Sequence, residues 1–193
     1  GGEGVGYQAP AAIGAALANK KHGRLTVCIQ PDGDLMIANG CLWTAAHYKI
    51  PILMLMHNNR CYHQEIMHVQ RMAAIHDRPQ ATARIGTEIA APAVDFAKVA
   101  QGMGVWAEGP ISDPAALGPA IRRALAVVKQ GKPALIDEVP AGRMHLDGRV
   151  LVAEGEGLAK DRRGMAFAGL LVVALVVDRK GRIAAPPTVL GEG

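Results

Sequence analysis

The chain has 193 residues, enough for one domain with a buried core and a short appendage but cramped for two domains. Half of the residues are hydrophobic and only 4% are aromatic, which favours a layered α/β interior of aliphatic side chains and excludes a disordered chain. The formal net charge is only +4 and the basic residues are scattered, so we expect no nucleic-acid-binding surface.

Cysteine content and apolar runs indicate the cellular setting. Three cysteines, Cys28, Cys41 and Cys61, occur without a Cys-x-x-Cys pair, which indicates reduced thiols and a cytoplasmic location. The N-terminus lacks the basic and apolar regions of a secretory signal. The longest apolar run, 166–177, is shorter than the ~20 residues that cross a bilayer. We therefore expect a cytoplasmic protein with no membrane partner.

The first 57 residues predict a helix, a strand, a second helix and a second strand, in that order. A glycine-rich segment at 1–6 is followed by Pro10, which suits the first turn of a helix. The expected helix, strand, turn, helix and strand lie at 11–19, 24–30, 31–34, 39–49 and 51–57. This order predicts parallel strands joined by right-handed crossovers, with functional loops at the carboxyl ends of the strands.

The remaining sequence divides near residue 139. Residues 58–84 are polar and predict a loop with a short helix at 65–72, where a ligand would bind. A helix, a strand, a helix and a strand are expected at 95–103, 104–107, 114–130 and 134–139. We thus predict a three-layer α/β/α domain with a mostly parallel sheet at 1–139. Turns at Asp147-Gly148 and Lys180-Gly181 predict a small β-rich appendage at 140–193.

Acidic and amide side chains follow the first two predicted strands. Asp32-Gly33 comes after the strand at 24–30, and Asn58-Asn59 comes after the strand at 51–57. Carboxylate, amide and main-chain oxygens are the ligands that Mg²⁺ prefers, and Mg²⁺ can bridge two oxygens of a diphosphate. A tight Asp-Gly turn would let a phosphate approach backbone N–H groups. Taken alone, the two motifs also fit two ordinary turns.

In this context the motifs resemble the cofactor-binding module of thiamine-diphosphate enzymes, whose signature is Gly-Asp-Gly followed, one helix and one strand later, by Asn-Asn. The separation here is 59 − 32 = 27 residues, which has room for both elements. The N-terminal GGEGVGYQAPAAIGA resembles the family's Gly-x-Pro-Ala-Ala-x-Gly-Ala segment, and the resemblance runs on through PALID at 133–137. It is to the acetolactate synthase and benzoylformate decarboxylase branch.

The resemblance implies that thiamine diphosphate is bound through Mg²⁺. Asp32 would supply a carboxylate oxygen to the metal, Asn59 its side-chain oxygen, and Cys61 its backbone oxygen, so the thiol is not needed. Gly33 and Asp34 would offer amide groups to the diphosphate.

The resemblance also assigns the organic part of the cofactor. In this family a bulky apolar residue of the glycine-rich segment supports the bent cofactor, and a nearby carbonyl accepts a hydrogen bond from its aminopyrimidine; Val5 and the carbonyl of Glu3 are the matching positions. The implied reaction is decarboxylation or ligation of a small 2-keto acid, with the catalytic residues unassigned. Polar residues that flank the Asn-Asn pair could be acid–base groups or ordinary loop residues: His57, His63, Gln64 and Glu65.

The chain departs from the family pattern in three ways. Pro31 replaces the first glycine of the signature, which fixes φ and removes an N–H. The chain begins within the module, so we expect it to be inactive alone and to need a homo-oligomeric partner or the missing pyrimidine-binding domain. The stretch from Ile136 to Ile183 resembles the segment after the nuclease domains of ribonuclease J, without that family's metal motif. An RNA-processing accessory segment and a non-functional fusion product are therefore the alternatives.

Two other cofactor patterns occur in the sequence. Imidazole and thiolate groups, the usual zinc ligands, occur at His57, Cys61, His63 and His68, but their spacing fits no standard structural zinc site. Gly2-x-Gly4-x-Gly6 follows no strand and lacks the complete spacing of a dinucleotide-binding loop. Neither pattern displaces the thiamine-diphosphate interpretation.

Overall fold

A mostly parallel sheet forms the centre of the computed structural model, which describes residues 5–140 and 175–177. Its strands lie in the order β3-β4-β2-β1-β5. The pairs β1–β2, β2–β4 and β3–β4 are parallel, and β5 is antiparallel to β1. The strands β1 to β5 span Leu25–Pro31, Ile52–His57, Trp106–Ile111, Ala134–Glu138 and Leu175–Val177.

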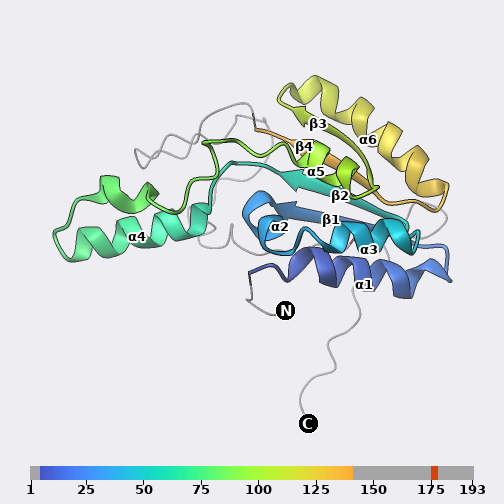
Figure 1. Cartoon of the computed structure of the whole chain (residues 1–193), viewed down its shortest axis with the longest axis horizontal. Coiled ribbons are helices and arrows are strands. Elements are labelled where there is room, and N and C mark those ends of the chain that lie inside the picture. Colours follow the sequence, from blue (N-terminus) through green and yellow to red (C-terminus); the bar gives the residue numbers. More distant parts are fainter. Residues whose placement is uncertain (1–4, 141–174, 178–193) are drawn as a thin grey trace, which may run out of the picture.

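The helices form a layer on each face of the sheet and one projecting arm (Figure 1). Helices α1, α2, α3 and α5 pack on one face, around buried side chains such as Leu42 and Phe96. Helix α6 covers the other face through Ala120 and Ala124. Helix α4 and the short 3-10 helix η1 extend away from the sheet and form the arm. The helices α1 to α4, then η1, α5 and α6, span Gln8–Lys20, Asp32–Ala38, Cys41–His47, His63–Ile75, Gln80–Arg84, Phe96–Gly102 and Pro114–Lys129.

Hydrophobic spacing explains these layers. Helix α1 buries Ala9, Ala12, Ile13 and Ala16, the spacing of one helical face, and their small size allows close contact with the sheet. Strand β2 is central, so its first three residues are all buried rather than alternating with exposed ones. The predicted three-layer α/β/α class with a mostly parallel sheet is confirmed.

One predicted element is wrong. Residues 31–34 do not form a turn, because helix α2 begins directly at Asp32. Pro31 ends strand β1 in an extended conformation, with φ −80° and ψ 156°, which a proline ring allows. Acidic residues are favourable in the first turn of a helix, where they face the positive end of the helix dipole, and α2 carries Asp32 and Asp34 there. The cofactor motif is therefore a strand-to-helix junction.

The described part of the C-terminal region is a single strand. Leu175–Val177 forms β5 and pairs with residues Leu25, Thr26 and Val27 at the edge of the sheet. The expected turns at Asp147-Gly148 and Lys180-Gly181 lie outside the described residues. The division into 1–139 and 140–193 stays a prediction. No helix in the described ranges combines the length and the apolar character that a membrane span requires.

Gly14→Ala is expected to raise the free energy of unfolding by about 0.5–1 kcal/mol, because glycine in a helix interior loses more backbone entropy on folding than alanine. Gly14 lies within α1, and a Cβ added there meets no atom within 4 Å. Urea unfolding measures the change. Gly40→Ala is the matched control: it is equally unobstructed but occupies the N-cap of α3, where alanine brings no gain. A lower denaturation midpoint for Gly14→Ala would refute the prediction.

Candidate functional site

The carboxyl ends of β1 and β2 bring the two sequence motifs to one edge of the sheet. Pro31 lies opposite His57 in this parallel pair, so Asp32 and Asn58 leave their strands side by side. The backbone amide of Arg60, in the second loop, is close enough to lower the pKa of the Asp32 carboxyl. The start of α2 and the loop at 58–61 therefore meet, as the predicted strand order requires.

Asp32 carries a buried carboxylate without a partner. It is 0% exposed, and neither of its oxygens accepts a hydrogen bond of normal geometry from any residue in 5–140 or 175–177. Burial raises the pKa of this carboxyl, and the amides of Gly33 and Arg60 offset that increase only in part. A buried charge without compensation is unfavourable. The two oxygens therefore provide what a divalent cation needs, which is an anionic ligand whose lone pairs are free.

The second loop holds its amide and thiol in a fixed arrangement. The backbone N–H of Cys61 donates to Oδ1 of Asn59 at 3.1 Å, and the Cys61 thiol donates to the same oxygen at 3.5 Å. Burial and the nearby Asp32 carboxylate raise the pKa of the Cys61 thiol to about 11, so the sulfur stays protonated at neutral pH. A protonated thiol is a poor metal ligand, which leaves the main-chain oxygen of Cys61 as its useful donor.

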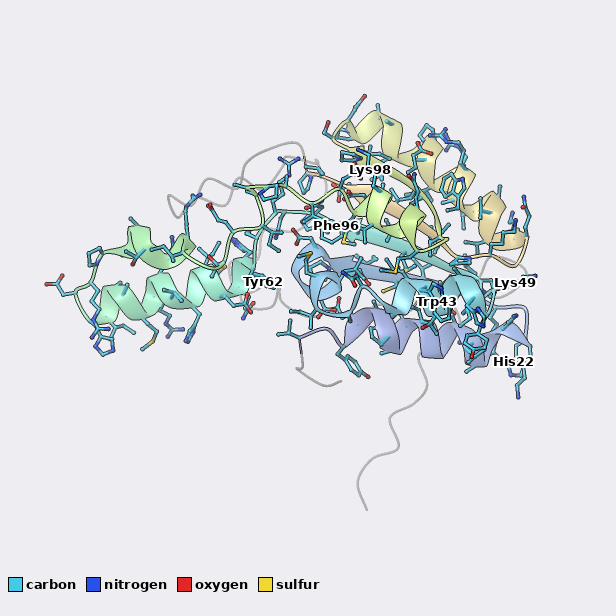
Figure 2. All side chains as sticks on the ribbon, in the orientation of Figure 1. His22, Trp43, Lys49, Tyr62, Phe96 and Lys98 are labelled. Atoms are coloured by element: carbon cyan, nitrogen blue, oxygen red, sulfur yellow. The ribbon has the colours of Figure 1, made fainter. Side chains whose placement is uncertain are left out.

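Tyr62 joins the two loops, and the sequence analysis did not identify it. A Cβ added at Gly33 would lie 2.6 Å from Cε1 of Tyr62, so the tyrosine ring occupies the space above that glycine. The backbone N–H of Tyr62 donates to the carbonyl oxygen of Thr87 at 2.8 Å. Tyr62 lies where the arm leaves the body of the protein (Figure 2). The Tyr62 ring therefore leaves no room for a side chain at position 33.

Asp34 anchors the N-terminal glycine segment to α2. Its Oδ1 accepts a hydrogen bond from the backbone N–H of Gly6 at 2.5 Å, and its Oδ2 accepts one from the N–H of Gln8 at 3.1 Å. The sequence suggested a role for the backbone amide of Asp34, whereas the structure adds a role for its carboxylate. Val5, next to Gly6, has a side chain that is 57% exposed and free to contact a ligand. Glu3 lies outside the described residues.

The polar residues around the Asn-Asn pair do not gather into one group. Nδ1 of His57 lies 3.1 Å from Oε2 of Glu138, and Gln64 and Glu65 are exposed. Nδ1 of His63 is buried and has no hydrogen-bond partner in the described part of the chain, and burial lowers the pKa of this imidazole. Within residues 5–140 and 175–177, no three His, Cys, Asp or Glu side chains are placed to hold a metal ion. A metal at this edge would need amide and main-chain oxygens as well.

A separate cavity of about 190 Å³ lies between the sheet and α6. Its lining is mainly apolar and includes Ile29, Leu55, Leu117 and Ile121, with His57 and Glu138 at its rim. Asp32, Asn59 and Cys61 do not line it. The cavity therefore takes no part in the candidate site.

A parallel α/β sheet that presents ligand-binding loops at its carboxyl edge is the general plan of a cofactor-binding domain. The chain matches the family model described as "Thiamine pyrophosphate enzyme, C-terminal TPP binding domain" over residues 2–138, well over half of its length. It belongs to this family of thiamine-diphosphate-binding domains, which confirms the resemblance to thiamine-diphosphate enzymes, whereas the resemblance of the C-terminal stretch to ribonuclease J stays a prediction.

Two curated relatives are similar over part of their length. IlvX of Mycobacterium tuberculosis, named as an acetolactate synthase large subunit, is 36% identical over 104 residues, which cover 54% of this chain and 20% of the relative. Benzoylformate decarboxylase of Pseudomonas aeruginosa is 32% identical over 104 residues, which cover 54% of this chain and 18% of that enzyme. The match thus spans about a fifth of each of these relatives.

Two solved structures have a similar fold. The thiamine diphosphate-dependent 4-hydroxybenzoylformate decarboxylase of Rhodococcus jostii has a TM-score of 0.55 and 29% identity, over 72% of this chain and 23% of that chain. Benzoylformate decarboxylase of Polynucleobacter necessarius has a TM-score of 0.53 and 19% identity, over 72% of this chain and 24% of that chain. The second likeness supports the fold alone.

Proposed function

We propose that this chain binds thiamine diphosphate through Mg²⁺, as the cofactor-binding part of a 2-keto acid decarboxylase or carboligase. The observation that carries the proposal is the buried carboxylate of Asp32, whose two oxygens accept no hydrogen bond of normal geometry from the described residues. A carboxylate in that state fits a hard divalent cation, because the cation supplies positive charge that compensates a buried anion. Family membership supplies the identity of the cofactor.

The proposed ligands come from both loops. Asp32 holds the metal through its carboxylate, Asn59 through Oδ1, and Cys61 through its carbonyl oxygen. The amides of Gly33 and Asp34 lie in the first turn of α2, where backbone N–H groups have no intrahelical acceptor and suit a diphosphate.

The remaining contacts would serve the organic part of the cofactor. Val5 supports its bent shape, and Asp34 holds the segment that carries Val5 through the Gly6 and Gln8 amides. Glu3 contributes its carbonyl. When bound, thiamine diphosphate supplies the electron sink for loss of carbon dioxide from a 2-keto acid, while the protein holds and orients it.

We expect the proposed activity to need protein beyond the matched residues 2–138. The match covers 20% and 18% of the two curated relatives, so the chain alone is expected to bind the cofactor without turnover. A homo-oligomeric partner or a pyrimidine-binding domain would complete the site. Reduced cysteines favour a cytoplasmic location for this assembly.

Calorimetric titration with thiamine diphosphate tests the proposal. Binding is expected in the presence of Mg²⁺ and is expected to disappear when EDTA removes the metal. Salt-sensitive binding of RNA together with no binding of thiamine diphosphate would refute the proposal and would favour a role related to the C-terminal resemblance to ribonuclease J.

Cys61→Ala is expected to bind thiamine diphosphate and Mg²⁺ with an affinity within about threefold of the unaltered chain, because the main-chain oxygen remains in place. The thiol is protonated and contributes only a weak hydrogen bond to Asn59. The same titration measures the effect. A loss comparable to that of removing a metal ligand would show that the sulfur itself binds the metal, contrary to the proposal.

A further inference from the structure

We propose that Asp137 is a positioning residue of the cofactor site, which holds the loop at 58–61 so that Asn59 and Cys61 face Asp32. The inference rests on the proposed function, because it assigns a purpose to a residue that does not itself reach the metal. Asp137 lies on β4, paired in register with Met56 of β2, one strand away from the loop that it would hold. We call the contact between Asp137 and Asn58 the brace.

Both oxygens of the buried Asp137 carboxylate accept hydrogen bonds, and one of them forms the brace. Asp137 is 0% exposed; its Oδ1 accepts a hydrogen bond from Nδ2 of Asn58 at 3.0 Å, and its Oδ2 accepts one from the N–H of Phe96 at 3.2 Å. Asn58 is itself only 2% exposed, and its backbone N–H donates to the carbonyl oxygen of Glu138 at 2.8 Å. Both the side chain and the main chain of Asn58 are thus attached to β4.

These contacts attach the loop to the rigid part of the protein. Beyond Asn58 the loop bonds mainly to itself and to the segment that follows the arm: Asn59 accepts from Cys61, the Arg60 carbonyl accepts from the N–H of Ile89, and Tyr62 donates to Thr87. Asn58 therefore links the metal-binding loop to the central sheet. A displacement of Asn58 would carry Asn59 with it, since the two are consecutive.

The neighbouring strand β3 leaves Asp137 little freedom. A Cβ added at Gly109 would lie 2.5 Å from the carbonyl oxygen of Asp137 and 2.7 Å from its Cβ, so the β3 backbone passes directly against this residue. The β3 backbone therefore limits the movement of Asp137. The Asp137 carboxylate in turn accepts hydrogen bonds from Asn58 and from Phe96, the first residue of α5. A group with fixed surroundings and two directed hydrogen bonds can set the position of a loop to within a narrow range.

Two substitutions at position 137 separate hydrogen bonding from charge. Asp137→Ala leaves the buried amides of Asn58 and Phe96 without an acceptor. Asp137→Asn can keep both contacts: its Oδ1 accepts from Phe96, and its Nδ2 donates to Oδ1 of Asn58 once that amide turns over. We therefore expect Asp137→Ala to weaken magnesium-dependent binding of thiamine diphosphate by about tenfold or more, and Asp137→Asn to restore most of the affinity.

Hydrogen–deuterium exchange in the metal-free chain provides a second readout that needs no ligand. Amides of the loop, that of Cys61 above all, are expected to exchange faster in Asp137→Ala and close to normally in Asp137→Asn. Gln101→Ala is the matched control, because it removes one hydrogen bond, from Nε2 to the carbonyl oxygen of Ala107 at 2.9 Å, remote from the loop. Its loop exchange and its cofactor affinity should be unchanged.

Asn58→Ala breaks the brace from the loop side and decides the question if Asp137→Ala does not fold. Faster loop exchange and weaker binding in Asn58→Ala support the inference. Unchanged loop exchange and cofactor affinity in a folded Asn58→Ala chain overturn it. An equal loss of cofactor affinity in Asp137→Asn and Asp137→Ala also overturns it, because the charge of Asp137 would then matter and not its hydrogen bonds. If the unaltered chain does not bind the cofactor, both the proposed function and this inference fail. If the unaltered chain and the variants all bind it normally, only this inference fails.

Discussion

The Asp32→Ala variant is expected to lose magnesium-dependent binding of thiamine diphosphate, with an affinity reduced by about a hundredfold or more. Asp32 is the one anionic ligand in the proposed set, since Asn59 and Cys61 contribute neutral oxygens. Removing it leaves the proposed ligand set with no negative charge to hold a divalent ion. Calorimetric titration with thiamine diphosphate at fixed Mg²⁺ measures the loss.

Asp113→Ala is the matched control for this substitution. Asp113 also follows a strand at the same edge of the sheet, but it caps α6 by accepting from the N–H of Ala115 at 2.9 Å. Its removal is expected to cost about 1 kcal/mol of stability and to leave cofactor binding unchanged. Equal affinity of Asp32→Ala and the unaltered chain would refute the proposed metal site.

The raised pKa of Asp32 also predicts how binding and stability depend on pH. The metal binds the ionised carboxylate, so affinity should fall on acidification, starting at a higher pH than for an ordinary aspartate. In the metal-free chain the Asp32 carboxyl binds a proton at a higher pH in the folded state than in the unfolded state. The free energy of unfolding therefore rises as the pH falls through the raised pKa of Asp32. Asp32→Asn should lack that contribution, and it should be more stable than the metal-free parent at neutral pH. Urea unfolding as a function of pH measures both trends.

Gly109→Ala is expected to lower the free energy of unfolding by about 3 kcal/mol or more, through backbone strain combined with a steric collision. Gly109 has a φ of +145°, which residues with a side chain rarely adopt. A Cβ there would lie 2.5 Å from the carbonyl oxygen of Asp137, and a backbone atom in a paired strand cannot move aside cheaply. Urea unfolding measures the loss.

Gly86→Ala separates the two causes. Gly86 has a φ of +77°, but a Cβ added there meets no atom within 4 Å, so only the backbone strain applies. The expected loss is about 1 kcal/mol. If Gly86→Ala and Gly109→Ala cost the same, the close approach of β3 to Asp137 would have no energetic consequence, contrary to the prediction.

Several structural features could be predicted from the sequence because they depend on residues close together in the chain. The alternation of strands and helices, the spacing of Asp32 and Asn59 and the glycine-rich N-terminal segment each depend on local hydrophobic pattern and short motifs. Parallel strands that are joined by one crossover end at the same edge, so the meeting of the two loops followed from the order of the elements. The turn expected at 31–34 failed for a local reason, since proline and aspartate suit a helix start as well as a turn.

The contacts that hold the site together depend on residues that are distant in the chain. Asp34 reaches Gly6 and Gln8 across 28 and 26 residues, and Asn58 reaches Asp137 across 79. Tyr62 covers Gly33 from the second loop. No periodicity or spacing reveals such pairs, because they depend on how the helices and strands pack and on which strands are neighbours.

By itself the sequence determined the α/β class, the family and the residue types expected around a diphosphate-bound metal, since hydrophobic period and short motifs are local properties of the chain. Only the tertiary structure decided that Asp32 is buried with no hydrogen-bond partner among the described residues, that Asp34 anchors the glycine segment and that β4 braces the second loop. The physical reason is that burial and hydrogen-bond partners arise from packing between helices and strands. The sequence therefore does not show whether water, an amide or a cation interacts with the oxygens of a given carboxylate.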